Sequence, residues 1–497
     1  MNRTAQVVVL LLAILGVATV LVVAMLLALD VGVATPRPTA VVDAPATGVG
    51  LPPATAHQSP PLAATAVSPA DTATHTPVSA TLPPAPTETP PPPPTETPPP
   101  PTETPPPPTE TPPAPTATTG PAPWLRPGHK YGIHLLLDDG RKHWLPGVWP
   151  QHLQAARRLA GEGGYVVQLI RLDDLDVARW QYFMDLCAET HLVPIIRLAT
   201  PFDHDKKWWE APPRDPDGRG YRRVAAQFRD FLAQLHWPTT PRYAIVHNEP
   251  NRGDEWGNRP DPAEYARYLR DVGDALHQID VTVLGPALDL YAPHSNGQPI
   301  NGYVYIDAES FLDGMAAAEP RALDVVDVWA AHAYAPDPFR LDPSRHFFQI
   351  DYANGANNPS HLTPPDGIYN RGVNSYRWEL WKLEQIAGPA AADLPVMITE
   401  TGWRHAPSQD AGARDHVHAE ISFETMSAYV DLAFHGNGGR YPDLPQTGWT
   451  PWNDDPRVLG AVLFALGGYP PDWGHTNWVT LDDRGQVTGF YPITLAR

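Results

Sequence analysis

Eight short runs of apolar and β-branched residues, most of them separated by stretches of helical length, constrain the fold of this chain more than any other feature. Such alternation is expected of parallel strands that are joined by helices. The runs span residues 131–137, 165–172, 192–199, 243–249, 281–288, 325–332, 395–400 and 458–466. Helical segments are expected at residues 151–160, 177–190, 222–235, 262–278, 308–318, 375–386 and 416–434.

Two topologies fit this alternation, a closed (β/α)8 TIM barrel and an open doubly wound sheet. The glycine fingerprint of a dinucleotide-binding sheet is absent after the first run. The long loops 200–221, 289–307 and 335–373 all follow strands, and in a barrel the loops after strands build the active-site face. The sequence therefore predicts an α/β fold of the (β/α)8 type.

The first 35 residues are expected to form an N-terminal membrane anchor or signal sequence. Residues 7–29 carry no charge and are long enough to cross a bilayer at about 1.5 Å per residue. Arg3 precedes the run and Asp30 follows it, which favours a single-pass orientation with the rest of the chain outside the cytoplasm. Cleavage near Gly32-Val33-Ala34 is the alternative, and it would give a secreted protein.

Residues 36–123 are rich in proline and threonine and are expected to form a disordered linker. They hold almost no large apolar side chains, so burial cannot offset the entropy of ordering them. Runs of proline favour extended polyproline II at about 3.1 Å per residue. The linker would hold the remaining domain, residues 124–497, away from the membrane, and the membrane contact would be confined to the N-terminal segment.

The charge and the cysteine content of the domain exclude several functions. The chain has a net charge of −20, and the first 123 residues hold two arginines against seven acidic residues, which leaves −15 for the domain. Nucleic acid is therefore not an expected partner. Cys187 is the single cysteine, and its apolar helical context indicates a core residue. No Cys/His cluster indicates a metal, no cofactor is expected, and we expect a monomer.

Two of the predicted strands end in a glutamate, in Tyr243-Ala-Ile-Val-His-Asn-Glu249-Pro and Val396-Met-Ile-Thr-Glu400-Thr-Gly-Trp403. In a parallel barrel the carboxyl ends of the strands converge on one mouth, so the two carboxylates can flank one bond. Glycoside hydrolysis requires such a pair, one to protonate the leaving oxygen and one to attack the anomeric carbon or activate water. Glu249 would carry a proton near neutral pH and Glu400 would stay ionised.

These motifs resemble those of the retaining (β/α)8 glycoside hydrolases of the clan that contains cellulases and mannanases. The resemblance implies that Glu249 is the acid/base and Glu400 the nucleophile of a double displacement on a glycosidic bond, expected to be β-linked, in an oligo- or polysaccharide. The two carboxyl groups would then lie about 5–5.5 Å apart. Asn248 carries an amide that can bond a sugar 2-hydroxyl group.

Further residues at strand ends are candidates for substrate binding. The resemblance implies that Tyr334 contacts the nucleophile and that His332 lines the pocket. Arg171 is expected to pair with Glu400, and Arg197 with Asp173 or Asp174. The remaining candidates are His134 at the pocket floor and the aromatic residues of the mouth loops, Trp403, Trp473 and Trp478 first among them, with Trp208, Trp209 and Trp256 nearby.

Two alternatives keep the barrel but not the activity. The first is a catalytically inactive, carbohydrate-binding barrel displayed on the cell surface, because a fold by itself does not establish a function. The second is a structural display module. Release of sugar from a polysaccharide or an aryl glycoside would separate the enzyme from both.

Overall fold

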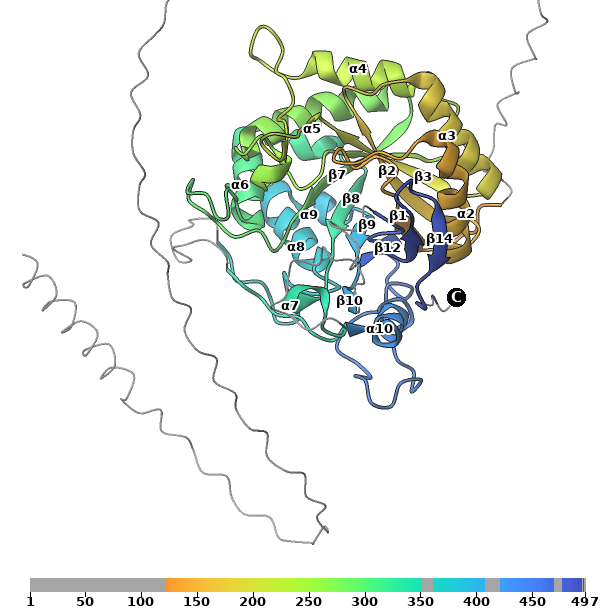
Figure 1. Ribbon diagram of the computed structural model, residues 1–497. Coiled ribbons are helices and arrows are strands. Elements are labelled where there is room, and N and C mark those ends of the chain that lie inside the picture. The colour runs from red at the N-terminus through yellow and green to blue at the C-terminus, as the bar shows by residue number, and fades with distance from the viewer. Residues whose placement is uncertain are drawn as a thin grey trace, which may run out of the picture. The chain divides into compact units, whose positions relative to one another are not determined.

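The computed structural model describes residue 122, residues 124–350, 361–406, 421–468 and 476–493, and residue 495. Eight parallel strands close into a barrel within these residues (Figure 1). They are β1 Tyr131–His134, β2 Tyr165–Arg171, β3 Val193–Ala199, β6 Arg242–Val246, β7 Val281–Leu288, β8 Val328–His332, β9 Val396–Thr401 and β12 Val458–Leu463. Their order around the barrel is β1-β12-β9-β8-β7-β6-β3-β2. The predicted closed barrel is confirmed, and the open doubly wound sheet is excluded.

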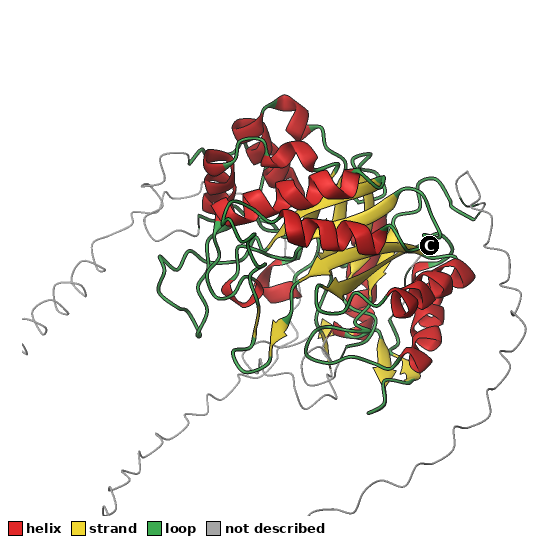
Figure 2. Cartoon of the chain, turned by 90° about the horizontal axis from the view of Figure 1, so that it is seen from above, coloured by secondary structure: helices red, strands yellow, loops and turns green. Residues whose placement is uncertain are grey.

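Helices follow most of the strands and pack against the outside of the barrel (Figure 2). The longer ones are α2 Trp149–Ala160, α3 Val177–Thr190, α4 Arg222–Leu232, α5 Pro262–His277, α6 Ala308–Ala318, α8 Tyr376–Ala387 and α10 Phe423–His435. Short helical turns are η1 Pro146–Val148, η2 Gly253–Glu255, η3 Ala322–Val325, α7 Pro336–Phe339 and α9 Pro389–Ala392.

Side-chain oxygens fix the starts of several helices. Asp176 accepts a hydrogen bond from the Arg179 amide at the start of α3, and Asp261 accepts from two amides at the start of α5. Each bond satisfies a backbone donor that the helix itself leaves unpaired. Asp307 accepts from the Ser310 amide at the start of α6, and α3, α5 and α6 all begin where the sequence predicts them.

Alternation along the strands divides the core into two layers. In β8, Val328 and Ala330 pack inside the barrel, whereas Trp329 and Ala331 face the surrounding helices. Successive side chains of a strand point to opposite faces. The alternation continues to His332, the last residue of β8, which is buried on the inner side at the carboxyl end of the strand.

Small two-stranded sheets lie outside the barrel. β4 Phe202–Asp203 and β5 Trp208–Trp209 form an antiparallel pair in the long loop after β3. The others are formed by β10 His405–Ala406 with β11 Ile421–Ser422 and by β13 Val479–Leu481 with β14 Val487–Phe490.

Several expected bounds differ from the structure. β1 ends at His134 rather than at 137, β8 begins at Val328 rather than at 325, β12 ends at Leu463 rather than at 466, and α10 begins at Phe423 rather than at 416. β6 ends at Val246 rather than at Glu249 because the backbone turns there, with φ of 71° at His247 and 38° at Glu249. The membrane anchor at 1–35 and nearly all of the linker at 36–123 lie outside the described residues. Among the described residues, no helix has the length and apolar character that a membrane crossing requires.

Candidate active site

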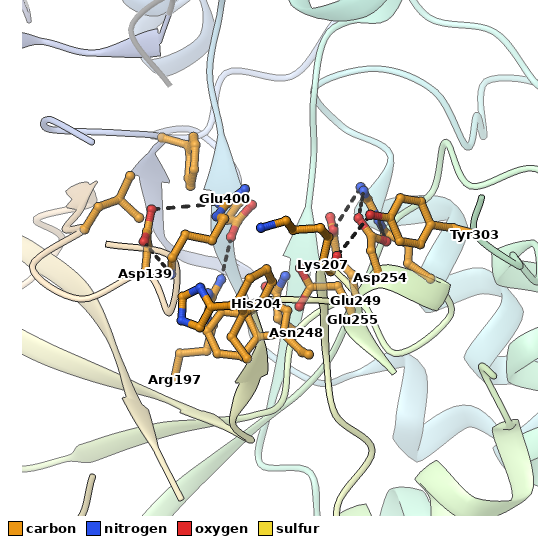
Figure 3. A pocket seen from close by; sticks show the side chains of 16 residues that line it. Asp139, Arg197, His204, Lys207, Asn248, Glu249, Asp254, Glu255, Tyr303 and Glu400 are labelled. Carbon is orange, nitrogen blue, oxygen red and sulfur yellow. Dashed lines mark hydrogen bonds and ion pairs between the residues drawn. The ribbon is translucent and has the colours of Figure 1, made fainter. Parts of the chain in front are cut away.

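A cavity of about 550 Å³ opens at the carboxyl ends of the strands and contains both predicted catalytic glutamates (Figure 3). Glu249 and Glu400 lie on facing walls with Asn248 between them in the view. The full lining is Leu136, Asp139, Arg141, Arg197, Phe202, His204, Lys207, Trp209, Asn248, Glu249, Arg252, Asp254, Glu255, Tyr303, Glu400 and Phe464.

The turn after β6 directs Glu249 into the cavity. His247 and Glu249 both adopt positive φ, a backbone conformation that costs non-glycine residues on the order of 1–3 kcal/mol and clusters at functional sites. The turn is held by a 2.7 Å hydrogen bond from the His247 imidazole to the Glu255 carbonyl oxygen and by a 2.9 Å bond from the Glu249 amide to the Ala287 carbonyl oxygen.

A β-bulge directs Glu400 into the same cavity. Ile398 packs outside the barrel and Met397 inside it, so simple alternation would turn Glu400 outward. The pairing of β9 with β8 shifts register, since Ala331 pairs with Ile398 but His332 pairs with Glu400. The extra residue reverses the side on which Glu400 lies, as a bulge does.

Two side chains donate hydrogen bonds to the Glu400 carboxylate. Arg197 Nη1 donates to Oε1 at 3.2 Å and the Tyr334 hydroxyl donates to Oε2 at 3.3 Å. Burial and the charge of Glu400 raise the pKa of Tyr334 well above its usual value, so the phenol remains a donor. Two donors, one of them a cation, stabilise the ionised carboxylate that a nucleophile requires.

His332 lies between the two glutamates. Its Nδ1 atom is 2.8 Å from Glu249 Oε1 and 3.8 Å from Glu400 Oε2. Burial opposes the charged imidazole, but Glu400 and Glu249 together raise the pKa of His332 to about 9. The imidazole is therefore a cation at neutral pH, and it neutralises part of the charge of the pair.

Glu249, His332 and Glu400 each offer one ligand atom, and these three atoms all lie within 4.8 Å of one another. A metal ion could be held by such a set only if the imidazole were neutral. The pKa of about 9 for His332 works against that state near pH 7. The arrangement therefore suits acid/base chemistry better than metal binding.

The expected pair between Arg171 and Glu400 is wrong, and Arg197 takes that place. In the register of β2 and β3, Arg197 is level with Leu169, and Arg171 lies two residues further along, level with Ala199. At the end of β2, the Arg171 guanidinium donates hydrogen bonds to Asp138 at 2.6 Å and to Asp173 at 2.9 Å. The expected pair between Arg197 and Asp173 or Asp174 is also not formed.

His134 and Asn248 lie beside the glutamates. Burial lowers the pKa of His134 well below its usual value, and the positive charge of Arg197 lowers it further. The neutral ring donates from Nδ1 to the Leu135 carbonyl oxygen, and its Nε2 faces Glu400 Oε1 at 3.6 Å, beyond hydrogen-bond distance. Asn248 lines the cavity, and its buried Oδ1 has no hydrogen-bond partner within the described part of the chain.

Of the tryptophans predicted at the mouth, Trp209 lines this cavity, whereas Trp403 and Trp478 do not. Trp403 is 1% exposed and its indole N–H donates to the Leu341 carbonyl oxygen. Trp478 is also 1% exposed and belongs to the outer core. Trp473 lies outside the described residues. Beside Trp209, the aromatic residues Phe202, Tyr303 and Phe464 line the cavity.

Two charged residues that follow the Asn-Glu-Pro motif were missed by the sequence reasoning. Arg252 pairs with Glu249 Oε2 at 3.2 Å, with Asp254 at 2.7 Å and with Asp289 at 3.2 Å. Glu255 lines the cavity, and burial raises its pKa to about 8 against the opposing charge of Arg197. Their position three and six residues after Glu249, in a loop at the predicted mouth, was the available signal.

Comparisons with known proteins give low similarity throughout. No family model matches the chain and no curated protein matches it. The GH128 (subgroup II) endo-β-1,3-glucanase from Pseudomonas viridiflava is 15% identical, with a TM-score of 0.37 over 72% of this chain and 94% of that chain. A β-mannanase from Streptomyces thermolilacinus is 16% identical, with a TM-score of 0.34 over 73% and 86%.

A family 1 β-glucosidase from Thermotoga maritima is 13% identical, with a TM-score of 0.36 over 73% of this chain and 96% of that chain. All three proteins are named as glycoside hydrolases, the class of enzyme whose motifs the two glutamate motifs of this chain resemble. Because the TM-scores lie below 0.5, a functional inference depends on the geometry of the cavity itself.

Proposed function

We propose that the protein is a retaining glycoside hydrolase that cleaves a β-linked glycosidic bond, with Glu400 as nucleophile and Glu249 as acid/base. The observation that carries the proposal is the approach of the two carboxylates to within 4.8 Å of each other across one cavity. Retaining enzymes place these groups about 5–5.5 Å apart, whereas inverting enzymes need about 6.5–9.5 Å to admit a water.

In the first step a Glu400 oxygen attacks the anomeric carbon and the bond to the leaving oxygen breaks. Arg197 and Tyr334 hold Glu400 in place, so the attack needs little reorganisation of the site. The product of this step is a glycosyl ester on Glu400. In the second step water attacks the same carbon, Glu249 takes its proton, and the Glu400 carboxylate is released.

The leaving oxygen receives its proton from Glu249, and His332 supports that transfer. The imidazolium N–H of His332 lies 2.8 Å from Glu249 Oε1. The His332 imidazole, whose pKa is raised to about 9, carries a proton at neutral pH. We assign the transfer of this proton from His332 to Glu249 to the substrate-bound state. The water of the second step then supplies the proton that restores the imidazolium.

Two features of the lining support a saccharide as the substrate. Asn248 lines the cavity beside the acid/base, and a side-chain amide can exchange hydrogen bonds with a sugar hydroxyl group. Trp209 and Phe464 add aromatic side chains to the same lining, and the C–H groups of a pyranose can pack on aromatic rings.

Azide rescue of two variants tests the proposal. Glu400→Ala should lose turnover of aryl β-glycosides and regain it with azide, giving an inverted glycosyl azide, because azide replaces the missing nucleophile. Glu249→Ala should keep most activity on substrates whose leaving group needs no proton, and azide should give a retained product. Retained azide product from Glu400→Ala would reverse the assignment, and a wild-type protein that releases no sugar from any glycoside would contradict the function.

A further inference from the structure

A lysine on the loop after β3 projects into the cavity. Lys207 lies in the turn between β4 and β5, and in Figure 3 its amine points into the space between Glu400 and Glu249. The Asp203 carboxylate accepts hydrogen bonds from the Asp205 and Lys206 amides at 3.0 and 2.9 Å. The Tyr303 hydroxyl donates to the Lys207 carbonyl oxygen at 3.0 Å. The turn is thus fixed from both sides, and Lys207 is held at the cavity.

A second cation lines the same cavity from the loop after β1. The Asp139 carboxylate accepts hydrogen bonds from the Arg141 and Lys142 amides at 3.0 and 2.7 Å. Gly140 has φ of 75°, and a Cβ atom there would lie 2.2 Å from the Trp209 ring. Glycine therefore allows the Arg141 loop to pack directly on β5, the strand that follows Lys207.

Four acidic side chains of the cavity already lie beside a cation, and the first of them, Asp139, lies 3.9 Å from Arg141. Glu400 is bonded by Arg197, and Glu249 by His332 and Arg252. Asp254 accepts two bonds from Arg252 at 3.0 and 2.7 Å.

The remaining acid at this end of the cavity is Glu255. Burial raises its pKa to about 8, so it is mostly neutral at pH 7. Lys207, in contrast, has no ion-pair partner among the residues that the structure describes. The Lys207 amine is thus an exposed positive charge at the cavity that no carboxylate of the described residues pairs with, although the domain as a whole is acidic.

We propose that the saccharide substrate carries an anionic group, either a uronate carboxylate or a sulfate ester, which binds to Lys207 beside Arg141. The inference rests on the proposed function, since it names the class of substrate for the same cavity. An anionic group on the substrate would be the ion-pair partner that no carboxylate of the described residues provides for Lys207. A charge-assisted hydrogen bond to such a group is stronger than one to a neutral hydroxyl group.

The experiment uses pairs of ligands that differ only in the anionic group. Oligomannuronate is compared with mannohexaose, and sulfated galactan oligosaccharides are compared with their desulfated forms. Binding is measured by calorimetry on the Glu400→Gln variant, which needs no turnover. We expect at least one anionic ligand to bind on the order of tenfold more tightly than its neutral counterpart, with an affinity that falls as salt is added.

Substitutions in the same turn show which residue is responsible. Added to Glu400→Gln, Lys207→Met should abolish the preference for the anionic ligand, and Lys207→Arg should retain it. Lys206→Met is the matched control, because Lys206 pairs with Asp203 and does not line the cavity. It should leave the preference intact. The pair of ligands that shows the preference distinguishes a uronate from a sulfate ester.

Equal binding of charged and neutral ligands, an equal effect of Lys207→Met on both, or binding of neither would overturn the inference. The proposed function is measured separately, by hydrolysis of aryl β-glycosides by the wild-type protein. Hydrolysis without a preference for anionic ligands would refute only the substrate class. A Lys207-dependent preference without any hydrolysis would refute only the enzymatic function.

Discussion

Replacing Arg197 by methionine should damage catalysis far more than the same change at Arg171. Both arginines lie near the carboxyl ends of neighbouring strands, but only Arg197 contacts Glu400, through a 3.2 Å ion pair in which each side chain is about one-tenth exposed. Two unit charges at 3.2 Å attract each other by about 5 kcal/mol at an effective dielectric constant of about 20. Tyr334 and His332 remain in the variant, so we expect roughly 3–4 kcal/mol of transition-state stabilisation to be lost, or about 10²–10³ in kcat/KM.

The assay is kcat/KM on an aryl β-glycoside, measured together with urea unfolding of both variants. Arg197→Met should also lower the free energy of unfolding by about 2–3 kcal/mol, because it leaves a largely buried carboxylate with less compensation. Arg171→Met removes bonds to Asp138 and Asp173 and should lower stability by about 1 kcal/mol with kcat/KM within threefold of the wild type. More than a tenth of the wild-type kcat/KM in Arg197→Met, or a larger loss in Arg171→Met, would refute the assignment.

Three further predictions follow from buried charge and from the N-terminal segment. Glu379 is fully buried and its carboxyl oxygens lack hydrogen-bond partners of good geometry; burial raises its pKa from 4.5 to about 8, against smaller effects of Trp329 and His332. In urea unfolding, the free energy of unfolding of the wild type should therefore fall by on the order of 3–5 kcal/mol relative to that of Glu379→Gln as the pH rises from 4.5 to 8. A difference between the two proteins that does not vary with pH would contradict this. The pKa of His332 is raised from 6.5 to about 9 in the folded protein, so its stabilising charge is fully present below pH 6.5 and is lost as the pH rises through about 9. The difference in unfolding free energy between the wild type and His332→Asn should therefore narrow by about 3 kcal/mol over that interval. A difference that stays constant would disprove this. We propose that residues 1–123 attach the domain to the outer side of a membrane and contribute nothing to catalysis, so their deletion should leave the kinetic constants on aryl glycosides unchanged while the protein no longer sediments with membranes; lost folding or lost activity would place the domain boundary elsewhere.

The sequence by itself determined the fold and the two glutamates of the site. Eight alternating runs predict eight strands because side-chain periodicity and turn residues are local properties of the chain. Glu249 and Glu400 were predicted as site residues for the same reason, since each ends an apolar run. A parallel barrel brings all strand ends to one mouth, and that rule needs no detailed packing.

The tertiary structure decided which side chains meet. The β-bulge that turns Glu400 inward and the register that puts Arg197 level with Leu169 depend on pairing between strands, and neither is encoded within one run. Trp403 looked like a sugar platform from its position after Glu400, yet it is buried against Leu341, while Phe464 lines the cavity. Loop conformation and strand register depend on contacts between residues distant in sequence, and local patterns therefore predict the elements of this site but not its contacts.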